Sequence, residues 1–141
     1  MTLKISDLSV GMELPALALT FTRADLVAYA HASGDLNPIH QDESFAKSVG
    51  LPDVIAHGML TMGRAIQVVT NWVGDPTRVI DYSVRMTRPV VVPDTAEGSV
   101  VSFTGKVAQI NDDGTVQVEL GAVFGDVKVL GLAKATVRLA Q

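Results

Sequence analysis

The stretch GMLTMGRAIQVVTNWV, residues 58–73, decides the fold because it predicts one long helix. At 1.5 Å per residue the helix is roughly 24 Å long, and the Gly-Asp-Pro sequence at 74–76 ends it. Its broad apolar stripe consists of Met59 or Leu60, Met62, Ile66, Val69 and Val73. Gly63 and Ala65 are small enough to let a backbone approach closely. These features suit a helix held inside a curled sheet.

After this helix the apolar residues alternate with polar ones, as in strands with one buried face. We predict strands at residues 79–87, 100–110, 115–124 and 127–139, which form two consecutive hairpins at their end. An earlier strand candidate spans residues 13–21. A long helix followed by a run of antiparallel strands indicates an α+β fold, a curved antiparallel sheet wrapped around the long central helix, and not a doubly wound one.

Two shorter helices are expected before the long one. Thr22 is a candidate N-cap for a helix that Gly34 ends, and Asp42 can cap a second helix that runs to Ser48, with Gly50 as its stop. The stretch that joins them, SGDLNPIH at residues 33–40, carries the most reactive side chains of the chain.

Asp35 and His40 lie five residues apart across an Asn-Pro corner. Pro38 fixes its own φ and keeps Asn37 out of the helical region, so the chain must turn between them. Asn37 can hold this turn through its own backbone. A carboxylate beside an imidazole can move a proton from one atom to another when both face one cleft. Taken alone, the pattern is better explained as an ordinary turn followed by a half-exposed loop histidine.

The whole string decides between these interpretations, because it resembles the signature of the MaoC-like, or (R)-specific hydratase 2, dehydratases. That signature has an aromatic residue, a short spacer, Ser-Gly-Asp-x-Asn-Pro-Ile-His and a small residue further on, here Ala46. The stretch AHGMLTMG at 56–63 resembles the second conserved block of the family. The likeness is closest to catalytic subunits of (3R)-hydroxyacyl-ACP dehydratases in mycolic-acid type II fatty-acid synthesis. It implies a hot-dog fold over residues 1–141 as one domain.

The resemblance implies catalysis by Asp35 and His40. One of them acts on the proton at C2 of the acyl chain and the other on the departing water. The sequence leaves the two roles open, and we prefer His40 at C2. Gly58 begins the long helix, where unpaired N–H groups favour an oxyanion, and the resemblance favours that role over a plain loop-to-helix joint. Asn37 and His57 belong to the expected substrate-binding group, although a packed, loop-bonding role is favoured for His57. The expected acyl pocket consists of Tyr29, Phe45, Met59, Leu60 and Met62, although for any one of them packing in the core is the favoured role. Cations that could attract a pantetheine phosphate, or simply solvate the surface, are Lys47, Arg64, Arg85 and Arg88.

Composition narrows the remaining classes. The 141 residues carry a net charge of −4 without basic clusters, which argues against nucleic acid as a ligand. With no cysteine, thiolate sites and disulfides are excluded, and a cytoplasmic location is expected. Residues 1–7 lack the pattern of an export signal, and no later window has the length of a membrane span. No metal and no cofactor beyond the pantetheine arm of the substrate are expected, since no paired His-x-x-x-His spacing occurs.

The expected function is therefore a (3R)-hydroxyacyl thioester dehydratase that also acts as a trans-2-enoyl thioester hydratase. The likeness favours long chains on acyl carrier protein, while a short-chain (R)-specific enoyl-CoA hydratase is an alternative. A hot-dog thioesterase and a non-catalytic acyl-binding subunit are further alternatives. An exposed sheet edge invites pairing with a second subunit, so we expect a homodimer or a heterodimer with a related hot-dog subunit.

Overall fold

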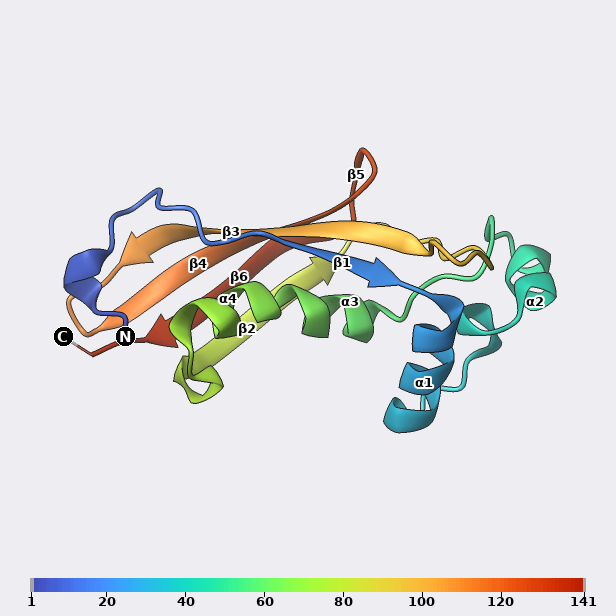
Figure 1. Ribbon diagram of the computed structural model, residues 1–141, viewed down its shortest axis with the longest axis horizontal. Coiled ribbons are helices and arrows are strands. Elements are labelled where there is room, and N and C mark those ends of the chain that lie inside the picture. The colour runs from blue at the N-terminus through green and yellow to red at the C-terminus, as the bar shows by residue number, and fades with distance from the viewer. Residues whose placement is uncertain (1, 141) are drawn as a thin grey trace.

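The computed structural model describes residues 2–140 and contains a curved antiparallel sheet with helices on one side (Figure 1). The strands are β1 (Leu17–Phe21), β2 (Val79–Met86), β3 (Ser99–Ile110), β4 (Thr115–Phe124), β5 (Val127–Lys128) and β6 (Leu130–Arg138). The helices are α1 (Arg23–Ser33), α2 (Glu43–Ser48), α3 (Gly58–Ala65) and α4 (Gln67–Val73), with short 3-10 turns η1 (Ile5–Asp7), η2 (Pro38–His40) and η3 (Pro76–Arg78). The strand order is β1-β3-β4-β6-β2, and β5 pairs with β4.

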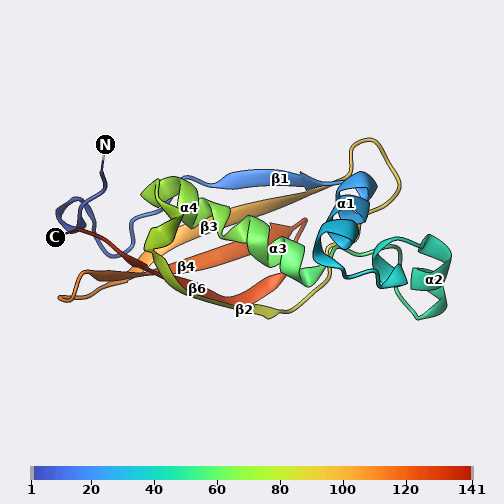
Figure 2. The ribbon, with the colours of Figure 1, turned by 90° about the horizontal axis from the view of Figure 1, so that it is seen from below.

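The predicted central helix is present as two consecutive segments, α3 and α4, which cross one face of the sheet (Figure 2). The interruption lies at Ile66, between the two segments. Just before it, the hydroxyl of Tyr82 on β2 donates to the carbonyl oxygen of Met62 at 2.7 Å. The sequence does not reveal this interruption, since the side chain that binds there comes from a distant strand.

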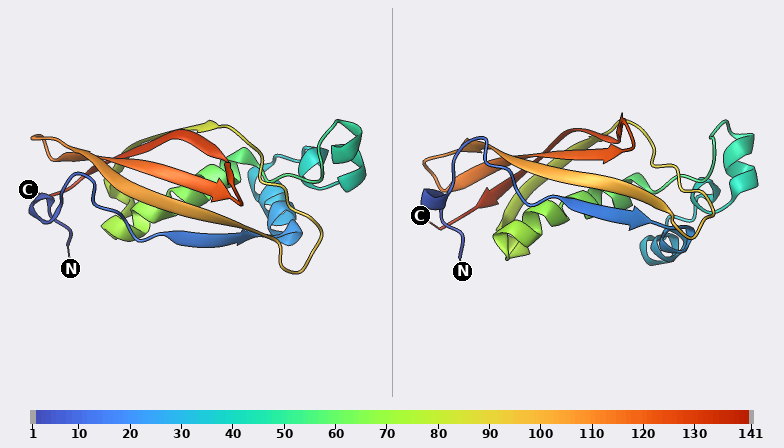
Figure 3. Two further views of the ribbon diagram at one scale, coloured as in Figure 1. Left: turned by 90° about the horizontal axis from the view of Figure 1, so that it is seen from above. Right: turned by 45° about the horizontal axis from the view of Figure 1, so that its top comes forward.

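The core lies between the sheet and the central helix. In β3, Val101, Phe103 and Val107 are buried, while residues 102, 104 and 106 are exposed, as strand alternation predicts. Gly105 continues the buried row, and a Cβ there would lie 3.0 Å from the side chain of Val68 on α4. The missing side chain therefore lets α4 pack closely on the sheet, behind the strands in the left view of Figure 3.

Two strands differ from their predicted limits. Residue 17 begins β1, although Glu13 makes an isolated bridge to Lys106 nearby. The expected final strand is divided into β5 and β6, because residues after the turn first pair with the end of β4. Within β6, Leu132 adopts φ 45° where the register with β2 shifts, which is a bulge with one residue in the left-handed region.

The predicted helix ends are confirmed. The Thr22 side chain accepts from the Asp25 N–H, and the Asp42 side chain accepts from the Phe45 N–H. Gly34 and Gly74 follow α1 and α4 with φ of 80° and 73°, a conformation that glycine adopts without strain. These local signals place α1 and α2 beside one end of the sheet (Figure 1).

The arrangement is the hot-dog fold that the sequence predicts: a curved antiparallel sheet around a central helix, in the α+β class. Within residues 2–140, no helix combines the length and the apolar character that a membrane crossing requires.

Candidate active site

The corner between α1 and α2 is held by its own side chains. Asp35 accepts from the Asn37 N–H through Oδ1 at 3.2 Å, and Asn37 accepts from the Ile39 N–H through its own Oδ1 at 3.2 Å. Pro38 then begins η2, which ends at His40. The predicted turn thus forms, and the side-chain oxygen of Asn37 serves the backbone of that turn.

His40 is buried and its orientation is fixed by a main-chain carbonyl. Its Nδ1 lies 2.7 Å from the Ile55 oxygen, and a carbonyl can only accept, so Nδ1 carries the hydrogen. In the neutral ring, Nε2 is then left with a free lone pair. This Nε2 lies 3.9 Å from Oδ2 of Asp35, whose side chain is 52% exposed. The structure therefore brings the two predicted catalytic residues together.

His57 packs against both of them. It is 1% exposed, its ring stacks on that of His40 with centroids 3.8 Å apart, and its Nε2 lies 3.1 Å from the main-chain oxygen of Asp35. The edge of Tyr29 closes the other side, with a centroid distance of 4.7 Å. Burial lowers the pKa of His57. The ring is therefore a neutral donor that supports the corner, in line with the packed role favoured from the sequence.

The other ring nitrogen of His57, Nδ1, differs from Nε2. It is buried without a hydrogen-bond partner among the described residues. Since Nε2 donates to Asp35, Nδ1 of the neutral ring is an acceptor. An unpaired acceptor is less costly to bury than a charged group, so this observation agrees with a neutral ring.

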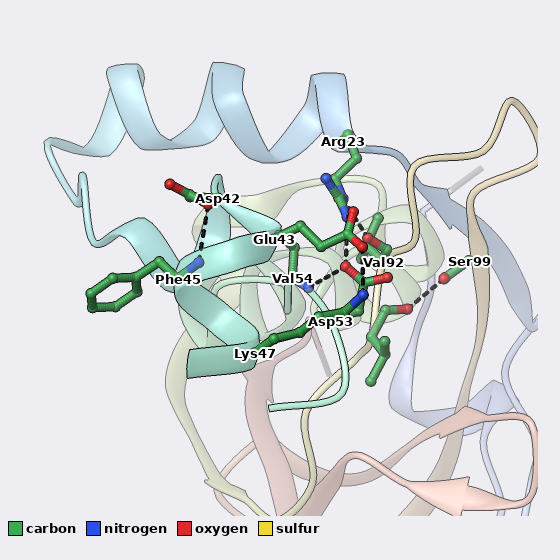
Figure 4. A network of polar contacts seen from close by, with 10 residues as sticks. Arg23, Asp42, Glu43, Phe45, Lys47, Asp53, Val54, Val92 and Ser99 are labelled. Atoms are coloured by element: carbon green, nitrogen blue, oxygen red, sulfur yellow. Dashed lines mark hydrogen bonds and ion pairs between the residues drawn. The ribbon is translucent and has the colours of Figure 1, made fainter. Parts of the chain in front are cut away.

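The carbonyl that orients His40 belongs to a loop tied down by an arginine (Figure 4). Arg23 donates from Nε to the Val92 oxygen and from Nη2 to Oδ1 of Asp53, both at 2.6 Å. Its Nη2 also lies 3.5 Å from Glu43 on α2. Main-chain bonds of Ala56 and Val92 join the same two loops. Elements far apart in the sequence thereby fix the position of the Ile55 carbonyl. No local sequence pattern predicts these contacts.

Gly58 and His40 line one cavity of about 340 Å³. As the first residue of α3, Gly58 has an N–H without a partner inside the helix, at the positive end of the helix dipole. The remaining walls include Thr61, Met86, Val90, Val129 and Leu130. This cavity offers a base, a main-chain donor and an apolar interior within one space, which suits proton transfer beside a carbonyl group.

The residues predicted for the acyl pocket do not line this cavity, although Tyr29 packs against His57 beside it. None of Tyr29, Phe45, Met59, Leu60 and Met62 lines the cavity that holds His40 and Gly58. Phe45 and Met59 are exposed, and Leu60 packs on the core. Sequence reasoning did not identify the residues that do line the cavity, namely Met86 at the end of β2 and Val129 and Leu130 at the β5–β6 junction. Alternation alone could not have identified them, since it describes every strand of the sheet equally.

Charged side chains near the site have different partners. Arg64 donates to the Thr20 oxygen at 2.7 Å and lies over the Phe21 ring, and Lys47 pairs with Glu43. These two predicted phosphate ligands are therefore engaged within the chain. Arg88 lines the cavity rim, and Arg85 lines a separate hollow on the sheet.

Asp35, His40 and His57 can bring one ligand atom each within 4.8 Å of one another. However, the rings of the two histidines are stacked at 26°. Histidine binds metals through lone pairs in the ring plane, and nearly parallel planes do not converge on one ion. The stacked rings do not favour a shared metal ion, whereas the lone pair of His40 beside Asp35 suits proton transfer.

Comparisons with known proteins give a consistent result. The profile of the family described as "MaoC like domain" matches residues 8–123. The chain is 43% identical to the 3-hydroxyacyl-thioester dehydratase X of Mycobacterium tuberculosis over 82 residues, which cover 58% of this chain and 28% of that protein. It is 32% identical to the (R)-specific enoyl-CoA hydratase of Rhodospirillum rubrum, over 67% of this chain and 65% of that protein.

Among solved structures, one described as a MaoC-like dehydratase superposes with a TM-score of 0.95 and 44% identity, covering 99% of this chain and 43% of the other. The chain thus spans less than half of the length of this structure and less than a third of the Mycobacterium tuberculosis protein.

Proposed function

The chain belongs to the MaoC-like domain family, and we propose that it is a (3R)-hydroxyacyl thioester dehydratase that also works in reverse as a trans-2-enoyl thioester hydratase. One observation carries the proposal: the free Nε2 of His40 lies 3.9 Å from Asp35, and His40 shares a cavity with the start of α3. The names of the Mycobacterium tuberculosis and Rhodospirillum rubrum relatives support the reaction class.

Dehydration removes a proton from C2 and a hydroxyl from C3. We assign the C2 proton to Nε2 of His40, since the Ile55 carbonyl leaves that nitrogen as the acceptor. Asp35, which starts this step as the neutral carboxylic acid, gives its proton to the departing hydroxyl, which leaves as water, and Asp35 becomes the carboxylate. The charge that develops on the thioester oxygen is stabilised by the N–H of Gly58. Return of the proton from His40 to Asp35 resets the pair, and hydration is the same sequence reversed.

The substrate is a 3-hydroxyacyl or trans-2-enoyl thioester of pantetheine, carried by acyl carrier protein or coenzyme A. The mechanism uses side chains and main-chain donors only, so it requires no cofactor beyond the pantetheine arm. We prefer long chains on acyl carrier protein, because the signature at residues 33–40 resembles that of (3R)-hydroxyacyl-ACP dehydratase subunits.

The assembly proposed is a homodimer or a heterodimer with a related hot-dog subunit. β2 lies at the end of the strand order, and it exposes Ile80. The side chain of Asp35 is half exposed, and exclusion of water from it would favour proton transfer. A second subunit at this edge would provide that exclusion. Light scattering tests the assembly, and a fully active monomer at micromolar concentration would contradict it.

The reaction is tested by incubating the protein with trans-2-butenoyl-CoA and trans-2-hexadecenoyl-CoA. A dehydratase consumes the enoyl absorbance while the thioester stays intact, and the product is the (3R)-hydroxyacyl ester. Release of free coenzyme A would instead identify a thioesterase. If neither product forms, with the related subunit absent or co-expressed, the chain is a non-catalytic acyl-binding subunit.

A further inference from the structure

Met86 lies directly on the helix start that holds the proposed oxyanion donor. It is the last residue of β2, and its Sδ, Cε and Cγ lie 3.2 to 3.4 Å from the position that a Cβ on Gly58 would occupy. The same side chain lines the cavity of His40. Gly58 and the thioether of Met86 therefore lie side by side on the wall of one cavity.

Most of the cavity around Met86 is rigid. Val90, Val129 and Thr61 are buried, and the Val90 oxygen accepts from the Ala56 N–H at 2.8 Å. The backbone that follows Met86 is fixed as well, because Thr87 donates from N to the Val129 oxygen at 3.2 Å and from Oγ1 to the Lys128 oxygen at 2.8 Å.

The side chain of Met86 itself is not confined in this way. It is 46% exposed, unbranched, and able to adopt several rotamers at low cost. Met86 is therefore a movable wall on a fixed backbone, beside the position proposed for the thioester carbonyl. The wall is apolar and continues into Val90, Val129 and Leu130, so it suits an acyl chain better than the amides of a pantetheine arm.

We infer that Met86 determines which acyl chains the site accepts, by setting the width of the cavity next to the carbonyl. This inference rests on the proposed function for its reaction and on the contact with Gly58 for its location. Shortening the side chain should widen the passage and favour longer or bulkier chains over short ones. A side chain of similar volume should leave the preference unchanged.

The test compares Met86→Ala with Met86→Leu, and uses Val100→Ala as the matched control. Val100 is a half-exposed apolar residue of β3 that does not line the cavity. kcat/KM is measured with trans-2-enoyl-CoA esters of four, eight and sixteen carbons. In Met86→Ala the sixteen-to-four ratio should rise at least about tenfold, the scale on which pocket size discriminates substrates. Both other variants should keep the ratio of the wild-type protein.

Equilibrium binding makes the inference independent of turnover. Kd values for saturated acyl-CoA esters of the same lengths are measured by calorimetry on the wild-type protein and the three variants. A changed length preference in Met86→Ala supports the inference even if the reaction proves to be thioester hydrolysis. An equal change at every length, or no change, overturns it, whereas failure of the wild-type protein to hydrate any enoyl ester overturns only the proposed reaction.

Discussion

The imidazole of His57 lies stacked on the imidazole of His40, with ring centroids 3.8 Å apart and planes 26° from parallel. The same residue holds the main-chain oxygen of Asp35 through Nε2. One buried side chain at the start of α3 therefore contacts the two proposed catalytic residues, and links them to the helix whose first N–H is the proposed oxyanion donor.

Replacing His57 should reduce turnover by displacing the acid/base pair. His57→Phe keeps an aromatic ring against His40 but loses the bond to Asp35, and His57→Asn keeps a donor but loses the stack. We expect kcat to fall by roughly 10- to 100-fold in each, because small displacements of reacting groups are costly, with KM changing less. Steady-state kinetics together with circular dichroism measure this. Wild-type kcat in a folded His57→Ala protein would show that the contact has no role in positioning.

Stability should fall on acidification because of His57. Burial lowers its pKa below the ordinary value of 6.5, so the unfolded chain binds a proton at a pH where the folded protein does not. The contribution is complete above about pH 6.5 and decreases as the pH falls below it. Urea unfolding of the wild-type protein and His57→Phe at pH 7.5 and 5.5 checks this. The variant should lose less stability between the two values.

Removal of either member of the acid/base pair should abolish most activity and leave the fold intact. Asp35→Asn and His40→Gln are expected to lower kcat by roughly two to four orders of magnitude, the usual contribution of a general acid or base. His31→Gln, at an exposed position of α1, is the control. Turnover of the trans-2-enoyl ester is measured for all three. Near-normal rates in both Asp35→Asn and His40→Gln would contradict the mechanism.

A side chain at Gly58 should affect activity more than stability. A Cβ there would lie 3.2 Å from the sulfur of Met86, which is half exposed and can move aside. Gly58→Val keeps the main-chain N–H, but its side chain should prevent the thioester carbonyl from reaching that donor and should reduce kcat/KM by about 100-fold or more. Thermal melting and kinetics are compared. A parallel collapse of both would indicate that Gly58 serves the fold alone.

Tyr82→Phe should loosen the central helix. The hydroxyl of Tyr82 bonds to the Met62 oxygen, and its loss is expected to cost about 1 kcal/mol of stability. Burial raises the pKa of Tyr82 to about 12, so above pH 10 the unfolded chain loses this proton first and stability decreases with pH. Denaturation at pH 8 and 11 tests both points. The phenylalanine variant should show the smaller decrease.

The parts of the structure that depend on neighbours in sequence could be predicted. Thr22, Asp42 and Gly34 act within a few residues of their positions, and the helix boundaries they predict are confirmed. The turn at Asn37 likewise depends on atoms two residues away. Strand alternation and the family signature together were sufficient for the hot-dog fold.

Features created by distant segments could not be predicted. The interruption at Ile66 lies beside a bond from β2, and the orientation of His40 depends on a carbonyl held through Arg23 and Val92. The acyl pocket expected on the helices is not part of the cavity at His40 for a related reason. Met86 and Val129, which line the cavity at His40, are brought together only by the pairing of strands distant in the sequence.

The pairing of β1 with β3 has a consequence for synthesis of the protein. Phe21 pairs with Ser99 and Leu17 with Phe103. β1 therefore cannot pair with β3 until residues 99–103 have been synthesised. The loop that orients His40 is bonded to Val90 and Val92, and the cavity is closed by Val129. A nascent chain emerging from the ribosome therefore carries the proposed acid/base pair long before the cavity beside His40 can form. Such long-range contacts form slowly, and truncated products would display the reactive corner without the means to use it.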